Sequence, residues 1–316
     1  MSLGTRPPLS ATLIFLATAC GCGGQLPGMP VVGKRAPAPG KGALERNAAP
    51  AAEKEQPAVG CLVNGRIVSA DWRDRGGGIE RAIVRVWTLP KRDHVKDVYG
   101  KGEPFEVRLP PGKYRLVCSA NGTRGATFEV ATREIEIADK LDYFDVGNVD
   151  LPISKTTSLY GKPAPELAGI IDWQDTPPIK LDTLRGHVVV LDFFGYYCSI
   201  CHEHKPDLVK LREKYQADGV VVLAVHDSSL ATLDEMNEKM QPALRRIFDG
   251  DPPNLPMALD GTGEQSVFNA YGIQAVPAVI LIDQRGRVVR RYHHAGKPEL
   301  ETDVRSLLSG HSTPLE

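Results

Sequence analysis

The chain has 316 residues, of which 42% are hydrophobic, and this length suffices for roughly two globular domains with additional tails. Its 38 basic and 39 acidic side chains give a formal net charge of -1, so electrostatics offers no reason to expect a nucleic-acid partner. The six cysteines fall into three pairs along the sequence, and each pair needs its own interpretation.

Residues 1–19 have the pattern of a secretory signal peptide. Arg6 precedes an apolar run over residues 9–19, which is too short for a membrane-spanning helix. The small residues directly before Cys20 resemble a bacterial lipobox, which favours cleavage there and attachment of a lipid to the Cys20 sulfur. Cys22 is a weaker alternative anchor, and an ordinary secretory signal cut elsewhere is the other interpretation. Both place the mature protein outside the cytoplasm, in the periplasm or an equivalent space.

The composition and the hydrophobic pattern of the sequence change twice after the signal peptide. Residues 20–59 are rich in Pro, Ala and Gly without apolar periodicity, so we expect a flexible tether that gives reach away from a membrane. Residues 60–152 show short alternating runs separated by Gly-rich or Pro-Gly turns, without helical stretches. This pattern predicts a small all-β sandwich, in which Trp72 and Trp87 serve packing and His94 lies in a solvated loop. The expected strands are residues 61–69, 81–89, 105–109, 113–120, 126–130 and 133–137.

Within this region, the segment FEVRLPPGKYRLVC, with GRIV near the start and GNVDLP near the end, resembles a carboxypeptidase regulatory-like (transthyretin-like) domain. The resemblance implies an accessory or protein-contacting role without catalysis. Cys61 and Cys118 lie on expected strands of this domain. In an oxidising compartment they can form a structural disulfide. Two buried free thiols are equally compatible with the sequence, because spacing along the chain says nothing about distance in space.

Residues 153–312 alternate between strands and helices, which predicts an α/β layer architecture with a mixed sheet. The runs over residues 188–194 and 220–226 are typical of buried strands. The remaining expected elements are helices over residues 207–217, 231–248 and 298–308, and a hairpin of residues 278–283 and 287–293 that turns at residues 284–286.

Cys198 and Cys201 form a Cys-x-x-Cys pair between the first of these strands and a helix. At the start of a helix, unpaired N–H groups and the macrodipole favour thiolate over thiol. Cys198 is therefore the candidate nucleophile, and Cys201, one turn further in, is expected to lie deeper and to react second. We expect the helix to turn Leu208, Val209 and Leu211 toward the core and His202, Glu203, His204 and Lys205 toward solvent.

Several separated features of this region resemble the thioredoxin fold and, within it, the TlpA/ResA-like thiol-disulfide oxidoreductases. They are the entry segments GKPAPEL and LDTLRGHVVVLDFF, Pro206 five residues after Cys201, and the segment YGIQAVPAVILIDQRGRVV. The resemblance implies an active-site helix bent at Pro206 and a cis-proline at Pro277 opposite the cysteines. It also implies that Val276 and Pro277 contact the substrate.

The chain departs from the family at two positions. The family usually has Trp directly before the first cysteine and Pro directly before the second, whereas this chain has Tyr197 and Ile200. The resemblance assigns Tyr197 to the substrate-binding surface. Ser199 and Ile200 change the hydrogen bonding and stiffness of the loop, which help to set the redox potential, so the direction of electron flow stays open.

Asp192 lies six residues before Cys198, where thioredoxins have a buried aspartate. A desolvated carboxyl group has a raised pKa, so it can accept or return the proton of the resolving thiol, through a water molecule. The other interpretation is a polar residue tolerated at a strand end. An acid inside an apolar run costs free energy unless it has a use, so we expect Asp192 to act as acid and base for Cys201.

The same residues allow other interpretations. Cys198, Cys201 and His202 spell Cys-x-x-Cys-His, the attachment pattern of c-type haem, in which the histidine ligates iron and both sulfurs become thioethers. A cytochrome needs neither the buried acid nor the cis-proline segment, so haem is the minor alternative. Zinc held by the same three residues is weaker still. The third class is a non-catalytic cell-surface binding module, in which the sandwich recognises a partner and the thioredoxin fold is incidental.

We therefore expect an extracytoplasmic, lipid-anchored thiol-disulfide oxidoreductase with a redox-active Cys198–Cys201 disulfide and no metal or other cofactor. Its expected partners are protein thiols and disulfides, and a membrane-side electron donor or acceptor. His226 and Asp227, at the end of the second buried strand, have no assigned role.

Overall fold

The computed structural model describes residues 60–174, 176–250 and 253–310. The expected signal peptide, the lipid attachment at Cys20 and the tether all precede residue 60 and lie outside these residues. Within the described ranges, none of the helices combines the length and the apolar character needed to cross a membrane.

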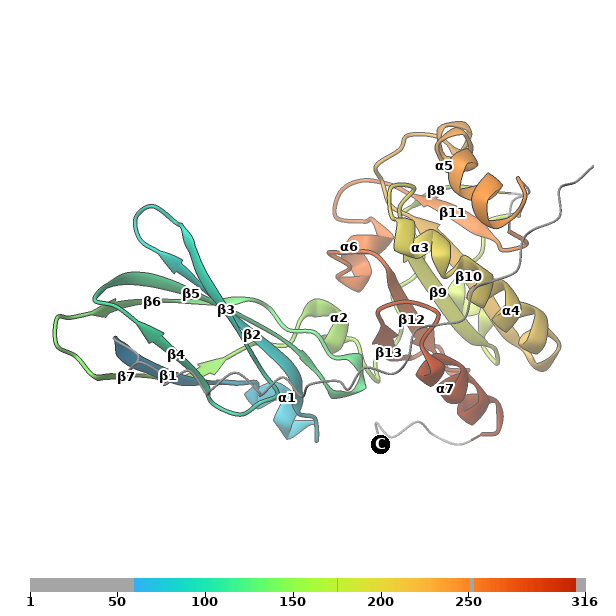
Figure 1. The fold of residues 1–316 in the computed structure, drawn as a ribbon. Helices are drawn as coiled ribbons and strands as arrows, with labels where there is room; N and C mark the ends of the chain where they lie inside the picture. The colour runs from blue at the N-terminus through green and yellow to red at the C-terminus, as the bar shows by residue number, and fades with distance from the viewer. Residues whose placement is uncertain (1–59, 175, 251–252, 311–316) are drawn as a thin grey trace, which may run out of the picture. The chain divides into compact units, whose positions relative to one another are not determined.

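Residues 61–150 form two sheets over one core. The three-stranded sheet has the order β4 (Phe105–Leu109), β1 (Cys61–Val68), β7 (Tyr143–Asp150), and the four-stranded sheet has the order β3 (His94–Gly100), β2 (Ile79–Thr88), β5 (Gly112–Gly122), β6 (Ala131–Ile137) (Figure 1). Val63 on β1, Val84 on β2 and Leu116 on β5 belong to one buried cluster, so side chains from both sheets build the same core. Alternation of buried and exposed side chains along these strands produces that inner face.

Three details of this region differ from the sequence predictions. The predicted strand over residues 126–130 is wrong, because Thr127 and Phe128 make only isolated bridges. His94 is not a loop residue but begins β3, an edge strand whose side chains are mostly exposed and therefore show no apolar alternation. A short helix, α1 (Ala70–Asp74), was not expected, and it carries Trp72, which is 1% exposed.

Cys61 and Cys118 are buried free thiols in this structure and are not joined by a disulfide. Cys61 lies on β1 and Cys118 on β5, and these strands belong to different sheets. Of the two arrangements that the sequence allowed, the structure has the unpaired one. Burial raises the pKa of both thiols, and that of Cys118 reaches about 11.

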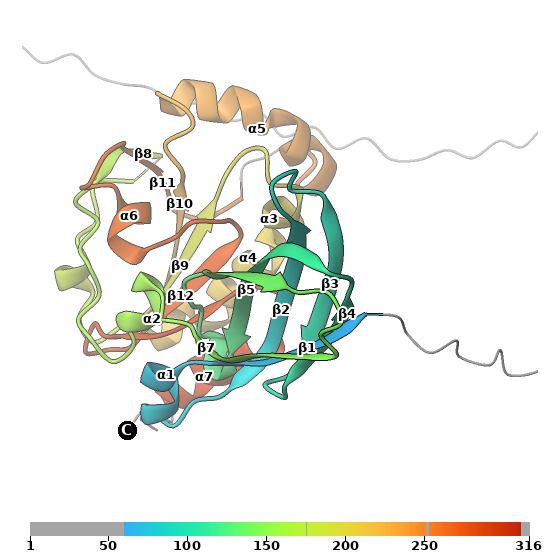
Figure 2. The same ribbon diagram turned by 90° about the vertical axis from the view of Figure 1, so that its left-hand side faces the viewer.

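The remainder of the described chain forms a six-stranded mixed sheet. Its order is β13 (Val288–Tyr292), β12 (Ala278–Ile282), β9 (Val188–Phe194), β10 (Val220–His226), β11 (Met257–Asp260), β8 (Ile170–Gln174), which makes β9 and β10 the central strands (Figure 2). β9, β10 and β11 run parallel, whereas β8, β12 and β13 pair antiparallel with their neighbours. The predicted mixed sheet and the two predicted buried strands, over residues 188–194 and 220–226, are confirmed.

Helices cover both faces of this sheet. They are α2 (Lys155–Ser158), α3 (Ser199–Glu203), α4 (Lys205–Tyr215), α5 (Leu233–Ile247), α6 (Val267–Tyr271) and α7 (Pro298–Leu308), with 3₁₀ turns at Leu181–Leu184 and Gln216–Asp218; a further 3₁₀ turn, Thr123–Gly125, belongs to the two-sheet region. Val188 and Val190 share a buried cluster with side chains of α4 and α7, whereas Val189 and Leu191 share one with α6. Because side chains alternate along a strand, the even-numbered residues of β9 face the helices that follow the cysteine pair.

Candidate active site

The two reactive cysteines lie where β9 passes into α3. The loop of Gly195, Tyr196 and Tyr197 follows the strand, and the Cys198 N–H closes a turn by donating to the Gly195 carbonyl at 3.0 Å. Cys198 is the N-cap of α3 and forms a disulfide with Cys201, with the two Cα atoms 5.3 Å apart. Cys198 is partly exposed and Cys201 is 3% exposed, so substrates can reach the first sulfur more easily than the second.

A break separates the helix that carries the cysteines from the longer helix behind it. α3 ends at Glu203, α4 begins at Lys205, and His204 joins them with non-ideal backbone angles. Pro206 lies in the first turn of α4, where a backbone N–H would have no partner within α4, so the proline costs that helix nothing. Because proline has no N–H to donate, it cannot extend the hydrogen bonding of α3 into α4. The predicted bend at Pro206 is therefore present.

Asp192 is buried and forms an ion pair with Lys205, whose ammonium donates to the Asp192 Oδ2 atom. The side chains of Lys205 and Asp192 are 1% and 5% exposed. The sequence prediction that Lys205 faces solvent is wrong. Lys205 follows Cys201 by four residues, which places both on the sheet-facing side of the helical segment, and that spacing was the available signal.

Two features of the surroundings of Lys205 act on its positive charge in opposite directions. Burial lowers the pKa of Lys205, while the neighbouring Asp192 carboxylate raises it and limits the shift. The Nζ atom lies 3.4 Å from the centroid of the Phe194 ring, on the next helix-facing position of β9. A carboxylate, an ammonium and an aromatic face thus lie together inside the protein, on the side of β9 that packs against the dithiol helix.

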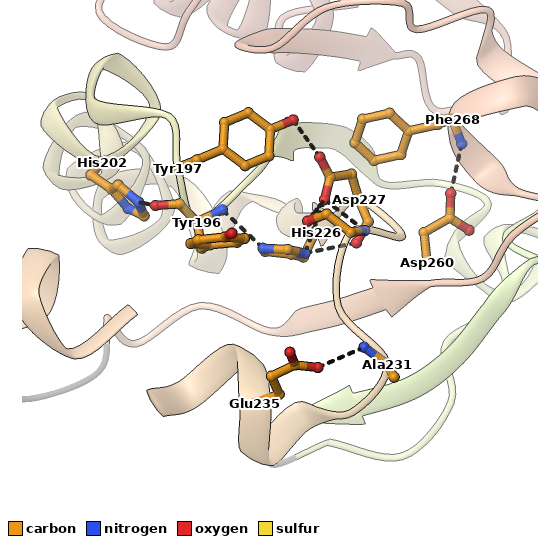
Figure 3. Close-up of polar contacts among 10 residues, drawn as sticks. Tyr196, Tyr197, His202, His226, Asp227, Ala231, Glu235, Asp260 and Phe268 are labelled. Carbon is orange, nitrogen blue, oxygen red and sulfur yellow. Dashed lines mark hydrogen bonds and ion pairs between the residues drawn. The ribbon is translucent and has the colours of Figure 1, made fainter. Parts of the chain in front are cut away.

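Two histidines bind the backbone of Tyr196, directly before the cysteine pair (Figure 3). The Tyr196 N–H donates to His226 Nε2 at 2.9 Å, and His202 Nε2 donates to the Tyr196 carbonyl at 2.8 Å. His202 is 5% exposed and His226 is fully buried, so the prediction that His202 faces solvent is also wrong. Burial lowers the pKa of both imidazoles, which favours their neutral forms.

The side chain of Tyr197 is tied to the end of β10. Its hydroxyl donates to Asp227 Oδ2 at 2.5 Å, and this hydrogen bond raises the pKa of the phenol to about 12 (Figure 3). The ring crosses Gly195, since a Cβ atom on that glycine would lie 2.7 Å from the Tyr197 ring and 3.0 Å from Asp227 Oδ2. Tyr197 nevertheless stays 60% exposed beside Cys198.

A cis peptide bond joins Val276 and Pro277, as the resemblance implied. β12 begins with the next residue, Ala278, which pairs with Phe193 at the end of β9. The antiparallel register thus brings the start of β12 beside the loop that carries the cysteines. Val276 and Cys198 both pack against the buried cluster that contains Cys201, so the cis-proline segment and the disulfide border the same apolar cluster.

A further buried acid plays a structural part. Asp260, at the end of β11, accepts the N–H group of Phe268 at 2.9 Å (Figure 3) and that of Val267, also at 2.9 Å, at the first turn of α6. Burial raises the pKa of Asp260, and the two N–H groups oppose that shift. Both carboxylate oxygens of Asp260 thus cap the first turn of α6.

A central strand that leads into a Cys-x-x-Cys disulfide at a helix start, with a cis-proline directly before the neighbouring strand of a mixed sheet, defines a thioredoxin-like fold. Residues 160–291 match the profile of the AhpC/TSA family. Protein DipZ of Mycobacterium tuberculosis is 34% identical over 152 residues, which are 46% of this chain and 21% of that protein. Thiol-disulfide oxidoreductase ResA of Halalkalibacterium halodurans is 32% identical over 121 residues, which are 38% of this chain and 61% of that protein.

The chain thus spans less than two thirds of the length of either relative. Among solved structures, a thioredoxin-like superfamily protein is similar with 25% identity and a TM-score of 0.40, over 48% of this chain and 99% of that one. A thiol-disulfide isomerase from Corynebacterium glutamicum is similar with 24% identity and a TM-score of 0.38, over 46% of this chain and 97% of that one.

Proposed function

We propose that the protein is a thiol-disulfide oxidoreductase that exchanges disulfides with protein substrates through Cys198 and Cys201. The observation that carries this proposal is the geometry of the pair: a disulfide at the start of a helix, with the more accessible sulfur first and Asp192 buried on the strand face that the helix covers. The sequence similarity to the oxidoreductase ResA supports the same activity.

In the reducing direction, the Cys198 thiolate attacks one sulfur of a substrate disulfide. A bond forms between the two sulfurs, and the other substrate sulfur leaves as a thiolate that takes a proton from water. Cys201 then attacks the Cys198 sulfur, which closes the Cys198–Cys201 disulfide and releases the second substrate thiolate. Two electrons pass from the dithiol to the substrate, and the oxidising direction is the reverse.

Cys201 must lose its thiol proton before it attacks, and we assign that proton to Asp192. Its carboxylate lies on the helix-covered face of β9 and is shielded from solvent, and the ammonium of Lys205 at the start of α4 balances its charge. A sulfur that is 3% exposed cannot readily give its proton to bulk water, so a nearby internal base is needed. The Asp192 and Lys205 pair therefore serves the second step of the exchange.

The substrate is proposed to lie across the cis-proline segment. The backbone at Val276 precedes the first residue of β12 and can pair with an extended peptide as an added strand. Tyr197 and Ile200, which are 60% and 49% exposed, give apolar contacts on either side of Cys198. This assignment follows the resemblance stated for Val276, Pro277 and Tyr197.

The location and anchoring of the protein are proposed from its sequence. We propose an extracytoplasmic protein anchored through a lipid on Cys20, with residues 20–59 as a tether and an electron donor or acceptor at the membrane. The β-sheets before the thioredoxin-like domain are proposed to be a carboxypeptidase regulatory-like accessory domain. The support is the signal-peptide pattern, the composition of the tether and the two-sheet core.

We further propose that Cys198 and Cys201 act as a redox-active disulfide and not as the attachment site of a haem. The buried Asp192 and the cis peptide bond before Pro277 support this proposal, because a haem-attachment site needs neither. Purified mature protein should therefore lack a Soret absorption band. A Soret band in that protein would overturn the thiol mechanism in favour of the cytochrome.

Trapping tests the exchange reaction directly. A Cys201→Ser variant should accumulate mixed disulfides between Cys198 and partner proteins, because the resolving thiol is missing. The Cys198→Ser/Cys201→Ser double variant is the matched control and should form none. If Cys201→Ser traps no adduct and the wild type does not reduce a model disulfide, the proposed function is wrong.

A further inference from the structure

The end of β10 contacts the loop that carries Cys198 at two points. The N–H of Tyr196 reaches His226, and the hydroxyl of Tyr197 reaches Asp227 (Figure 3). β9 and β10 are parallel and pair Phe194 with His226, so the residues just beyond β9 lie beside the last residue of β10. The last residue of β10 and the residue that follows it thus hold the two residues that immediately precede the nucleophile.

The partners of His226 define its tautomer. Nε2 receives the N–H of Tyr196, which can only donate, so Nε2 carries no proton. Nδ1 lies 2.7 Å from the Asp227 carbonyl and 3.5 Å from its Oδ1 atom, so Nδ1 carries the proton and donates it there. The imidazole also lies parallel to the Tyr196 ring, with the centroids 6.1 Å apart, and edge-on to the Phe194 ring. These contacts fix the orientation of the neutral imidazole, which accepts one backbone N–H.

Asp227 is held as firmly. Its Oδ1 atom receives the N–H of Ser229 at 3.1 Å and also the Ser229 hydroxyl, which leaves Oδ2 for Tyr197. The tyrosine can reach that oxygen only across Gly195, where a Cβ atom would collide with the ring. The sequence Gly-Tyr-Tyr before Cys198 therefore matches the His-Asp pair at the end of β10.

We propose that His226 and Asp227 are positioning residues for the redox pair, which hold the Tyr196–Tyr197 segment so that Cys198 stays in place for closing the disulfide. This inference rests on the proposed function. The two residues act on the cysteine pair through their hydrogen bonds to Tyr196 and Tyr197. When the disulfide is reduced, the loop loses one covalent constraint and gains freedom. The two hydrogen bonds limit that gain, so they favour the disulfide over the dithiol.

The test is the equilibrium of the Cys198–Cys201 couple in glutathione buffers, read by alkylation and mass spectrometry. His226→Phe keeps a ring but loses the acceptor, and it should lower the equilibrium constant for disulfide formation by up to about tenfold, the limit reached when the buried hydrogen bond is made in the disulfide form alone. That change corresponds to a potential about 30 mV higher. His226→Gln offers an oxygen close to the position of Nε2 and should restore most of the wild-type value.

Tyr197→Phe provides a second variant at a largely exposed residue, where failure to fold is not expected. It removes only the hydroxyl bound to Asp227 and should lower the constant about threefold, as expected for a partly exposed hydrogen bond. Tyr99→Phe is the matched control, because the exposed Tyr99 hydroxyl also donates to an aspartate, Asp97 at 3.4 Å, on β3. It should leave the constant unchanged.

The outcomes separate the two proposals. If the wild type exchanges with glutathione while His226→Phe and Tyr197→Phe keep its equilibrium constant, the positioning role is wrong and the proposed function stands. If His226→Gln falls as far as His226→Phe, the hydrogen bond to Tyr196 is not the cause and the inference is again overturned. If the wild-type couple does not exchange with glutathione or a model disulfide at all, both proposals fail.

Discussion

Replacing Lys205 by methionine should strongly destabilise the protein, because it leaves the Asp192 carboxylate buried without its partner. The two side chains are 1% and 5% exposed, so water cannot readily replace the lost ammonium. Removing one member of such a pair typically costs about 3–5 kcal/mol. Methionine has an unbranched chain of similar length, so the cavity left behind adds little to that cost.

The double variant distinguishes charge from packing. Asp192→Leu/Lys205→Met removes both charges and replaces them with apolar groups, so it should recover most of the stability that Lys205→Met loses. Unfolding by urea at pH 7, with the disulfide intact, gives the free energy for the wild type, both single variants and the double variant. The double-mutant cycle then isolates the coupling between the two side chains.

Lys214→Met is the matched control for this cycle. Lys214 also lies on α4 and donates to a carboxylate, Glu301 Oε1 at 2.7 Å, but its side chain is 61% exposed. Such a pair is screened by water, so the urea midpoint should hardly move. If Lys205→Met unfolds at the same urea concentration as Lys214→Met, or if the double variant loses the sum of both single effects, Asp192 and Lys205 do not act as a buried pair.

The remaining predictions concern groups whose pKa is shifted by burial. The pKa values of His202 and His226 are lowered from the usual 6.5, so the unfolded chain binds more protons below that pH. The contribution of these two neutral histidines to stability should therefore be complete above pH 6.5 and should be lost as the pH falls from 6.5 toward their pKa values in the folded protein. His226→Gln should then flatten the decline of the urea midpoint between pH 7 and 5, and equal slopes for the variant and the wild type would contradict this origin. Cys61 and Cys118 should resist iodoacetamide in the folded protein and react quickly in guanidinium, as measured by mass spectrometry of their peptides, because burial raises both thiol pKa values. Rapid labelling without denaturant would show that their strands open readily.

The strands of the thioredoxin-like domain were predictable because their signal is strong. Every residue of β9 is buried, so a continuous apolar run marks it in the sequence. β3 shows the opposite case. It lies at a sheet edge with most side chains exposed, so neither alternation nor hydrophobicity identifies it, and hydrogen bonding to β2 alone makes it a strand.

The solvent-facing assignment of Lys205 failed for a different reason. Amphipathic patterning assigns charged residues to the outer side of a helix, and that rule holds only while no buried partner compensates the charge. Here the partner is Asp192, thirteen residues earlier and on another element. A buried acid inside β9 or a buried lysine four residues after Cys201 would each be costly alone. As a pair, each side chain supplies the counterion of the other.

The contact between His226 and Tyr196 depends on strand register, which is hard to obtain from these two strands. β9 and β10 are both apolar along nearly their whole length, so sliding one past the other by a residue changes little in the hydrophobic pattern. The structure pairs Phe194 with His226, and only that register places the imidazole beside the first residues of the cysteine loop. A slip by one residue would leave the Tyr196 N–H without its acceptor and separate Asp227 from Tyr197. The polar ends of the two strands therefore supply the specificity of register that their apolar centres lack, and the same hydrogen bonds that align the strands hold the residues before Cys198.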